Sequence, residues 1–583
     1  MRAAVLAAGL LSAGAFATEA SNATDAINAT TLTASFWASC KCFPGEPCWP
    51  SARAWSSLNS TVGGRLIETV PLAKACHDPS LDPAQCQALQ ERWQFPDMHM
   101  NDSASIMAPF FANQSCDPFT PASTPCTLGN YVRYAVAASC TEDVVAAITF
   151  AKTHNIRFVI RNTGHDYLAR STGAGALSIW THKLKGIEFK TWYDWNYQGG
   201  AVKVGAGVQG FEVLDAAKAR GKVVVTGECS TVGLAGGYTQ GGGHSALSTS
   251  FGLSADNTLE FQVVTAAGKL VTASRTTNSD LYWALSGGGG GNYGVVVSLT
   301  VKTFPDRKIG GASLSFFSHE NPTETFYAAI DAFHAALPAM VDAGSMVVYY
   351  FTSTFFMIAP LTAYNKSEAE VRAMLAPFVA TLNSMNVTYT AAYSETANYW
   401  DHYDKYFGPL PNGNIQIGIA QYGGRLIPRS AVTDPVQAEK LAATARFIAE
   451  QGVTWIGVGT DVSRFGSGCV NAVLPAWRKT LVHVSLTTPW SFEPSKWGDM
   501  LEAQDFMTNT IMPAIEAATP GSGAYMNEAD FQQPNFKEVF FGANYNSLLS
   551  IKKKYDPDYF FYASAAVGSD KWKVANDGRM CRA

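Results

Sequence analysis

The segment GECSTVGLAGGYTQGGGH, residues 227–244, decides how the rest of the chain is interpreted. Seven of its eighteen residues are glycine. Glycine at this density lets the backbone approach a flat or phosphorylated ligand closely, because no Cβ intervenes. A loop that merely turns corners is the structural alternative. Taken alone, the segment therefore predicts a ligand-binding loop without defining the ligand.

A second candidate loop has the sequence RNTGHDY at residues 161–167 and follows a predicted strand, Ile156–Arg161. It would lie at the carboxyl end of that strand, where successive backbone N–H groups can form a nest for phosphate. Gly164 permits a backbone conformation that residues with a Cβ resist. His165, taken alone, is most simply a loop histidine.

A third glycine run, residues 287–291, follows the predicted helix Ser279–Leu285 and precedes the predicted strand Val295–Val301. It matches G-x-G-x-x-G only trivially, and it leads into a strand instead of opening a helix, so a Rossmann site is weakly supported. The sequence contains no G-x-x-x-x-G-K-[ST], H-E-x-x-H or G-x-S-x-G pattern. Phosphoryl transfer, zinc proteolysis and α/β-hydrolase chemistry therefore lose support.

The composition of the 583-residue chain is that of a globular protein, with 47% hydrophobic and 15% charged residues. At roughly 150 residues per domain, the length predicts two to four domains. The net charge is −5 and no long basic stretch occurs, which argues against a nucleic-acid partner. The densest basic run, Lys552–Lys554, is interpreted as solvated surface.

The amino terminus predicts export. Arg2 precedes an apolar run from Ala3 to Ala17 that ends in a small-x-small cleavage site, so residues 1–17 are interpreted as a signal peptide, with a short buried helix as the alternative. Glycosylation sequons occur at Asn22, Asn28, Asn59, Asn101, Asn113, Asn365 and Asn386. We therefore expect a secreted, extracellular glycoprotein.

The uncharged stretch 343–365 is long enough to span a bilayer. It is rich in Val, Tyr and Phe, which favours one or two buried strands over a transmembrane helix. No membrane partner is expected.

The eleven cysteines fit an oxidising compartment. They are Cys40, Cys42, Cys48, Cys76, Cys86, Cys116, Cys126, Cys140, Cys229, Cys469 and Cys581. Eight of them precede residue 141, which predicts a disulfide-stapled amino-terminal region. Cys229 stands apart in the glycine-rich segment, and the other ten allow up to five disulfides.

The pattern of elements divides the chain into an α+β arrangement. After the signal peptide, residues 18–125 form a cysteine-rich extension with few regular elements. Short strands and helices alternate over 126–306. Residues 307–518 mix aromatic strands with helices such as 367–382 and 435–451, and residues 519–583 carry a further motif cluster.

Taken together, the three loops resemble the flavin oxidases of the vanillyl-alcohol oxidase superfamily, in its berberine bridge enzyme-like branch. The shared elements are R-x-x-G-H-x-Y at 161–167, G-x-C-x-T-V-G-x-x-G-G-x-x-x-G-G-G at 227–243, FGLSADN at 251–257, DLYWAL at 280–285, and FGANY at 541–545 followed by Leu548 and residues 552–557. The amino-terminal CKCFPGEPCWP at 40–50 resembles secreted fungal members, including isoamyl alcohol oxidase-like proteins.

The resemblance implies a fold and a cofactor. It implies a PCMH-type FAD-binding domain of two subdomains, a substrate domain with an antiparallel sheet over the isoalloxazine ring, and a carboxy-terminal berberine-bridge-type segment that completes the FAD site. His165 matches the histidine bonded to the flavin 8α-methyl group, and Cys229 matches the cysteine bonded to flavin C6. A disulfide or a free buried thiol are the alternatives for Cys229.

Other residues enter the predicted FAD site through the same motifs. They are Arg161, Asn162, Thr163, Gly164, Asp166, Ser171, Thr231, Gly233, Gly236, Gly237, Gly242, Gly243, Asn527 and Asn544. No metal site is expected.

The implied reaction is a two-electron oxidation, in which a C–H group gives a hydride to flavin N5 and a protein base takes the O–H proton. Val232 matches the position that gates oxygen, with a plain core residue as the alternative. Tyr525 and Asn527 match positions near the flavin. Glu528 is the candidate base, with a pKa raised in a partly dry pocket, and a structural salt bridge is its alternative. His244, Asp401, His402 and Tyr403 are further conceivable pocket residues.

The sequence thus predicts a secreted, FAD-dependent protein with one of three functions. The first is an oxidase of an alcohol or carbohydrate that uses O2 and releases H2O2. The second is a biosynthetic oxidase of a secondary metabolite, and the third is a weakly reactive flavin-binding protein. A monomer acting on a small molecule is expected in each case.

Overall fold

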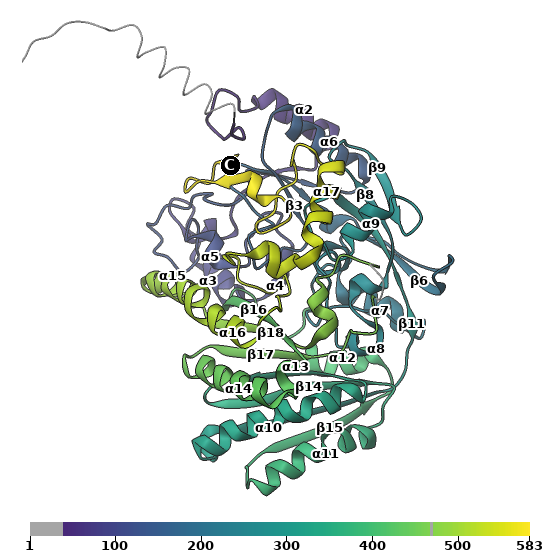
Figure 1. Cartoon of the computed structure of the whole chain (residues 1–583). Coiled ribbons are helices and arrows are strands. Elements are labelled where there is room, and N and C mark those ends of the chain that lie inside the picture. The colour runs from purple at the N-terminus through teal and green to yellow at the C-terminus, as the bar shows by residue number, and fades with distance from the viewer. Residues whose placement is uncertain (1–38, 467–469) are drawn as a thin grey trace, which may run out of the picture.

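The computed structural model describes residues 39–466 and 470–583 (Figure 1). The predicted signal peptide, the sequons at Asn22 and Asn28, and Cys469 lie outside these described residues.

The amino-terminal region has more regular structure than its sequence suggests. Its elements are α2 (Ala52–Thr61), β1 (Leu66–Glu68), α3 (Pro83–Arg92), α4 (Pro96–Met100) and α5 (Pro109–Ala112). Side chains start two of the helices, because Ser51 accepts from the N–H of Ala54, and Asp82 accepts from the N–H groups of Ala84 and Gln85.

Four disulfides tie this region together, joining Cys40 to Cys581, Cys42 to Cys48, Cys76 to Cys86, and Cys116 to Cys126. The first of them links the amino-terminal region to the last strand across 541 residues. Within the described residues, Cys140 and Cys229 carry free thiols.

Two sheets form the next part of the chain. The first has the order β1-β2-β4-β3, with β2 (Tyr134–Ala137), β3 (Phe158–Arg161) and β4 (Leu177–Trp180) parallel to one another. The second is antiparallel, in the order β5-β6-β10-β8-β9, and its strands are β5 (Ile187–Tyr193), β6 (Gln198–Gly205), β8 (Thr258–Val264), β9 (Leu270–Ser274) and β10 (Val295–Lys302).

Four α-helices and a pair of short strands lie in the segments that connect or follow the strands of these sheets. They are α6 (Thr141–Thr153), α7 (Gly210–Lys218), α8 (Ser248–Phe251), α9 (Ser279–Leu285), and the pair β7 (Lys222–Val223) and β11 (Phe304–Pro305). β8 and β9 pair antiparallel as a hairpin. α6 begins at Thr141, and Cys140 precedes it at the cap position.

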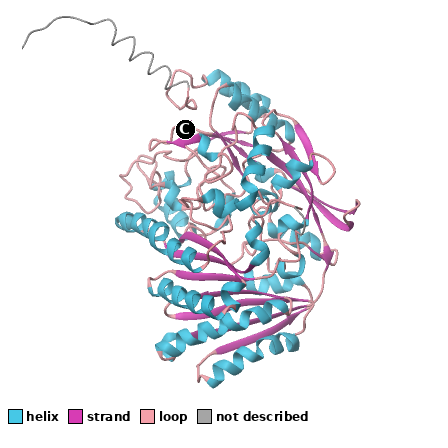
Figure 2. Ribbon diagram, in the orientation of Figure 1, coloured by secondary structure: helices cyan, strands magenta, loops and turns pink. Residues whose placement is uncertain are grey.

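A seven-stranded antiparallel sheet forms the lower part of the molecule in Figures 1 and 2, and long helices cover one of its faces. Its order is β15-β12-β14-β13-β17-β18-β16, with β12 (Ile309–Phe317), β13 (Ser345–Phe351), β14 (Phe355–Tyr364), β15 (Thr390–Thr396), β16 (Ala420–Pro428), β17 (Thr454–Gly459) and β18 (Thr480–Pro489). The helices are α10 (Thr323–Asp342), α11 (Glu368–Ser384), α12 (Tyr399–Phe407), α13 (Ser430–Thr433) and α14 (Pro435–Glu450).

The apolar sides of α10, α11 and α14 pack on this sheet in one buried core. The uncharged stretch 343–365 forms β13 and β14 in this sheet, as predicted. Among the described residues, no helix combines the length and apolarity needed to cross a membrane.

The carboxy-terminal segment returns to the first two sheets, and its last strands lie beside the amino-terminal region (Figure 1). Its elements are α15 (Trp497–Phe506), α16 (Met512–Ala518), α17 (Tyr545–Tyr555), β19 (Trp572–Val574) and β20 (Met580–Arg582). Phe540, Phe541 and Leu548 are buried in the same core as the strands of those sheets. The chain thus closes over the loops that carry the predicted site.

Candidate active site

A cavity of about 540 Å³ lies where three parts of the chain meet. The first part is the loop that follows β3, and the second is the glycine-rich segment 227–244. The third comprises strands β13, β16, β17 and β18 of the seven-stranded sheet together with residues 525–528. The cavity is lined by the following predicted site residues: Asn162, Thr163, Gly164, His165, Asp166, Ser171, Cys229, Val232, Gly233, Gly236, Gly237, Tyr525, Asn527 and Glu528.

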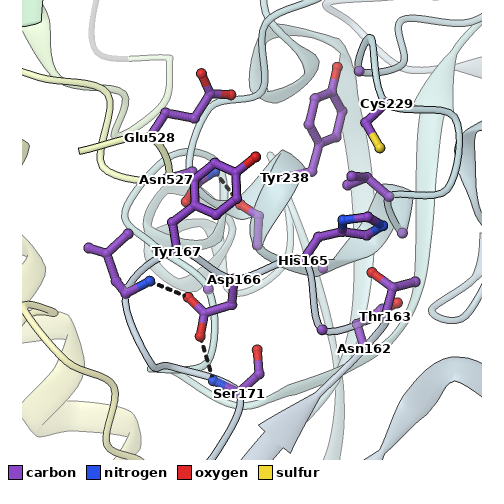
Figure 3. A pocket seen from close by; sticks show the side chains of 18 of the residues that line it. Asn162, Thr163, His165, Asp166, Tyr167, Ser171, Cys229, Tyr238, Asn527 and Glu528 are labelled. Atoms are coloured by element: carbon purple, nitrogen blue, oxygen red, sulfur yellow. Dashed lines mark hydrogen bonds between the residues drawn. The ribbon is translucent and has the colours of Figure 1, made fainter. Parts of the chain in front are cut away.

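His165 and Cys229, 64 residues apart in sequence, lie at one end of this cavity (Figure 3). One hydroxyl connects them, because the Thr231 Oγ1 atom lies 2.8 Å from His165 Nε2 and 3.3 Å from Cys229 Sγ. Within the described residues, His165 Nδ1 has no hydrogen-bond partner. The two predicted FAD-linking side chains are therefore brought together with one ring nitrogen left free.

The surroundings keep the His165 ring neutral. Burial lowers the pKa of His165 to about 3, with further lowering by the charges of His99 and Arg161. Burial raises the pKa of Cys229, and hydrogen bonds from Thr231 and from the backbone N–H of Val232 oppose that shift. A neutral imidazole retains a lone pair, which is what a nucleophile requires.

The loop after β3 is held by its own polar side chains. The Asp166 carboxylate accepts hydrogen bonds from the backbone N–H groups of Leu168 (2.9 Å) and Ser171 (2.8 Å), as Figure 3 shows. Asn162 Nδ2 donates to the Ala206 carbonyl at 2.6 Å. These contacts order the loop around Gly164, whose φ of +91° favours glycine.

The cavity wall next to this loop is bare backbone. A Cβ at Gly237 would meet no protein atom within 4 Å, so a side chain there would enter the cavity, and a Cβ at Gly290 would come within 2.8 Å of the Gly237 Cα atom. A flat, phosphorylated cofactor needs such a surface, and the free His165 and Cys229 atoms stand at its end. The residues present therefore fit FAD.

Five predicted cofactor-binding residues do not line the cavity. Arg161 is buried beneath the loop, donating to the carbonyls of His99 and Asp102, and a Cβ at Gly164 would lie 2.6 Å from its guanidinium. Thr231 is fully buried behind the two linking residues. Asn544 donates to the carbonyls of Ala472 and Val473.

The other two are Gly242 and Gly243, which form a turn at positive φ. At Gly243 a Cβ would come within 2.9 Å of Ser254 and Tyr238. None of these five residues lines the cavity, and their contacts support the loops that do.

An ion-pair network occupies the cavity wall opposite the loop. The two Glu528 oxygens lie 2.9 Å from His244 Nε2 and 2.8 Å from His483 Nε2. Ser485 donates to Glu528 at 3.1 Å, and the Glu228 carboxylate lies 3.3 Å from His244 Nδ1. Four titratable side chains from three distant segments thus meet beside Cys229.

The expected rise in the pKa of Glu528 is wrong. Burial alone would raise it, but the charge of His244 and hydrogen bonds from His244 and His483 hold the pKa of Glu528 well below its usual range. Burial likewise opposes the charge on His244, yet Glu528 and Glu228 raise the pKa of His244 to about 10. The salt-bridge alternative for Glu528 therefore describes the structure, with Glu528 ionised and His244 protonated.

Three further residues named from the sequence, Tyr525, Asn527 and Tyr403, contact the segments that form the site. Tyr525 lies edge-on to both histidine rings, and Asn527 Nδ2 donates to the Tyr525 hydroxyl and to the Gly237 carbonyl at 2.8 Å each. Tyr403 donates to the carbonyls of Gly227 and Glu228.

Two candidates lie away from the cavity. Asp401 pairs with Lys218 at the surface, and His402 is buried against Thr362.

Several cavity residues were missed by sequence reasoning. Glu228 directly precedes Cys229 in the chain, whereas Tyr350, Tyr422 and Ser485 lie on strands without a recognisable motif. His483, on β18, is fully buried behind the cavity surface. Tyr422 stacks on Tyr167 with ring centroids 3.9 Å apart, so this pair joins the seven-stranded sheet to the loop after β3. The ligand atoms of His244, His483 and Glu528 lie within 4.8 Å of one another, a spacing that a metal ion also tolerates.

Comparisons with known proteins agree with this geometry. Residues 132–274 match the family described as FAD binding domain, and residues 524–568 match the family described as berberine and berberine like. An FAD-linked oxidoreductase of Gibberella zeae is 58% identical over 94% of this chain and 95% of its own length. The crystal structure of a VAO-type flavoprotein from Myceliophthora thermophila superposes with a TM-score of 0.91 and 42% identity, covering 94% of this chain and all of that one.

A more distant structure shares the fold. The glucooligosaccharide oxidase of Acremonium strictum, whose FAD is described as 6-S-cysteinyl and 8α-N1-histidyl, superposes with a TM-score of 0.61 at 19% identity over 75% of this chain and 92% of that one. The chain belongs to the VAO-type, berberine bridge enzyme-like family of flavoproteins, and it is an FAD-linked oxidoreductase. The predicted α+β architecture is thereby confirmed.

Proposed function

We propose that this chain is a secreted oxidase that removes a hydride from a C–H group of an alcohol or carbohydrate and passes the electrons to O2, giving H2O2. The observation that carries the proposal is the juxtaposition, in one cavity, of the His165 and Cys229 nucleophiles with the Glu528–His244 network. FAD, when bound, supplies the two-electron acceptor.

Two covalent links to FAD are part of the proposal, through His165 to the 8α-methyl group and through Cys229 to C6. The free Nδ1 atom and the free thiol at the same cavity end support it. The double linkage described for the Acremonium strictum enzyme uses the same two residue types. A thiol engaged by a cofactor is also protected from oxidation outside the cell.

The Glu528–His244 pair is the proposed acceptor of the substrate O–H proton. Glu528 lines the cavity as a carboxylate, so it can form a new O–H bond as the substrate O–H bond breaks. A low pKa makes a carboxylate a weak base, but the positive charge of His244, which lines the same cavity and pairs with Glu528, favours the loss of the substrate proton. Val232, on the cavity surface beside Cys229, is the proposed oxygen gate.

A second candidate substrate class is favoured by the wall that the seven-stranded sheet contributes. Its cavity-lining members include Tyr350, Tyr422, Ile456 and Val458. Ile417 and Ile419, in the loop that precedes β16, extend this apolar surface. Such a surface suits an apolar or aromatic alcohol better than an oligosaccharide, which requires many hydrogen-bonding partners. We therefore include oxidation of a secondary metabolite as the alternative.

Secretion rests on residues 1–17 and on the sequons. Asn101, Asn113, Asn365 and Asn386 are exposed and Asn59 is half-buried, as glycan attachment requires. A mass shift on enzymatic deglycosylation of the protein secreted by a fungal host tests this part. A secreted protein without any shift would contradict glycosylation.

The decisive experiment is peroxide release in air by the purified holoprotein against matched apolar alcohols, oligosaccharides and amines. Peroxide with an alcohol or a sugar is expected, together with anaerobic bleaching of the flavin. If no class of substrate bleaches the flavin, the chain is a flavin-binding protein and the oxidase proposal fails.

A further inference from the structure

We propose that Thr231 is a positioning residue whose single hydroxyl presents both His165 and Cys229 to FAD, so that the two covalent links depend on one side chain. This inference rests on the proposed double linkage. The hydroxyl lies 2.8 Å from His165 Nε2 and 3.3 Å from Cys229 Sγ, and it is fully buried.

The direction of the two hydrogen bonds follows from what each partner must do. His165 is neutral, so only one of its ring nitrogens carries a proton. When Nε2–H donates to the Thr231 oxygen, the Nδ1 lone pair is the one offered to the cavity. The Thr231 O–H is then free to donate to Cys229 Sγ, which stabilises the thiolate.

One hydroxyl can fill both roles at once, because a threonine oxygen accepts and donates simultaneously. The opposite arrangement has Thr231 donating to Nε2, which leaves the proton on Nδ1 and blocks that nitrogen as a nucleophile. The distances of 2.8 Å and 3.3 Å accommodate both arrangements, and only the first leaves the Nδ1 lone pair available for the link at His165.

Thr231 is held rigidly enough for this role. Its carbonyl accepts from Gln209 Nε2 at 2.8 Å, and the neighbouring Ser230 and Val232 carbonyls accept from the N–H groups of Phe211 and Gly210. The start of α7 thus fixes the turn 229–232 from behind. The Thr231 hydroxyl has no other partner among the described residues.

Each link is balanced when O2 is the oxidant. At His165, the 8α C–H bond and the Nε2–H bond break, and a C–N bond forms at Nδ1. At Cys229, the C6–H and S–H bonds break and a C–S bond forms. In each case two protons and two electrons leave, and O2 takes them as H2O2.

The test is the rate of covalent attachment in the full chain. Wild type, Thr231→Val and Thr231→Ser are produced under riboflavin limitation, mixed with FAD in air, and sampled for the masses of the peptides that contain residues 165 and 229. The valine variant loses one hydrogen bond at each linking residue, which is expected to slow each attachment by about tenfold. The serine variant keeps the hydroxyl and should stay close to the wild-type rate.

The outcomes separate this inference from the proposed function. If wild type carries no covalent flavin, the double linkage itself fails. If wild type is doubly linked and Thr231→Val links both residues at the wild-type rate, the role of Thr231 is overturned. Thr231→Ala removes the same hydroxyl and gives the same test if the valine variant does not bind FAD.

The most specific test measures covalent attachment of FAD to His165 in a Cys229→Ser variant. The His165 link must still slow when Thr231→Val is added, because its tautomer depends on the hydroxyl and not on the thiol. An unchanged rate in that background would also overturn the proposal.

Discussion

The two walls of the cavity are built differently. The wall formed by residues 161–171 and 227–244 comes from two continuous loops, and its side chains are spaced by short steps in sequence. The wall formed by the seven-stranded sheet takes one residue from β13 and two alternate residues from each of β16, β17 and β18. The residues of the predicted cofactor wall therefore lie close together in sequence. The residues of the sheet wall come together only through the pairing of distant strands.

Side chains of the loop wall should determine whether FAD becomes covalently attached. Their removal gives the largest effect that we expect. In His165→Ala combined with Cys229→Ser, covalent flavin retained after acid precipitation should fall from essentially all to none, because both linking atoms are gone. Absorbance of the washed precipitate measures it.

The matched control is Cys140→Ser, the other free thiol among the described residues. It should retain all of its flavin. Flavin that survives acid treatment in the double variant would show that another side chain makes the link.

Glu528 lies where the two walls meet, and its removal should slow the chemistry without releasing FAD. In Glu528→Gln, we expect anaerobic flavin reduction by an alcohol to slow by about 100-fold, the low end of the usual range for a lost general base. Stopped-flow absorbance measures the rate.

Asp530→Asn is the control, because that buried carboxylate lies two residues further on and bonds Gln504 instead of facing the cavity. In Asp530→Asn, the flavin should be reduced by the alcohol at nearly the wild-type rate. Equal rates in wild type and Glu528→Gln would exclude Glu528 as the proton acceptor.

These two cases show what the sequence could and could not predict. His165 and Cys229 were predicted from the resemblance of the motifs that contain them to the flavin oxidases, and the structure places both in the lining of one cavity. The prediction of a raised pKa for Glu528 is wrong because His244 and then His483 lower that pKa, and both contacts join residues far apart in sequence.

The same limit applies to Lys552, which was interpreted as solvated surface. It is buried and pairs with Asp556 at 2.7 Å, while also donating to the carbonyls of Asn292 and Phe561. A charged run reveals neither its partners nor its burial. The pair with Asp556 is local, at i,i+4, but the contact with the Asn292 carbonyl spans 260 residues. Contacts at that separation cannot be predicted from a local pattern, whereas most helix and strand positions can.

The sheet wall should control substrate choice alone. Ile456 lies on β17 and faces the cavity, so Ile456→Asn removes apolar contact from the substrate. The KM for an apolar alcohol should rise about tenfold, since the contact of one aliphatic side chain is worth roughly 1.5 kcal/mol. Steady-state peroxide assays measure it.

Ile456→Val keeps an apolar side chain and should change KM little. Covalent flavin should be unchanged in both variants. A loss of flavin attachment in Ile456→Asn would break the separation of the two walls.

The smallest expected effect concerns pH and the pair that joins the walls. The pKa of His244 rises from 6.5 to about 10 on folding, so between these values the folded chain keeps a proton that the unfolded chain has released. The stability that this proton contributes is fully present below pH 6.5 and is lost as the pH rises towards 10. The slope is at most about 1.4 kcal/mol per pH unit.

His244→Gln should therefore flatten the fall in unfolding free energy between pH 7 and 10, measured by denaturant titration at each pH. His402→Gln is the control, because burial lowers the pKa of His402 to about 3 and that ring carries no proton to lose in this range. If the slope of wild type persists in His244→Gln, the imidazolium is not what holds Glu228 and Glu528 together. The stacked Tyr167 and Tyr422 rings, another close contact between the two walls, would then remain to join them.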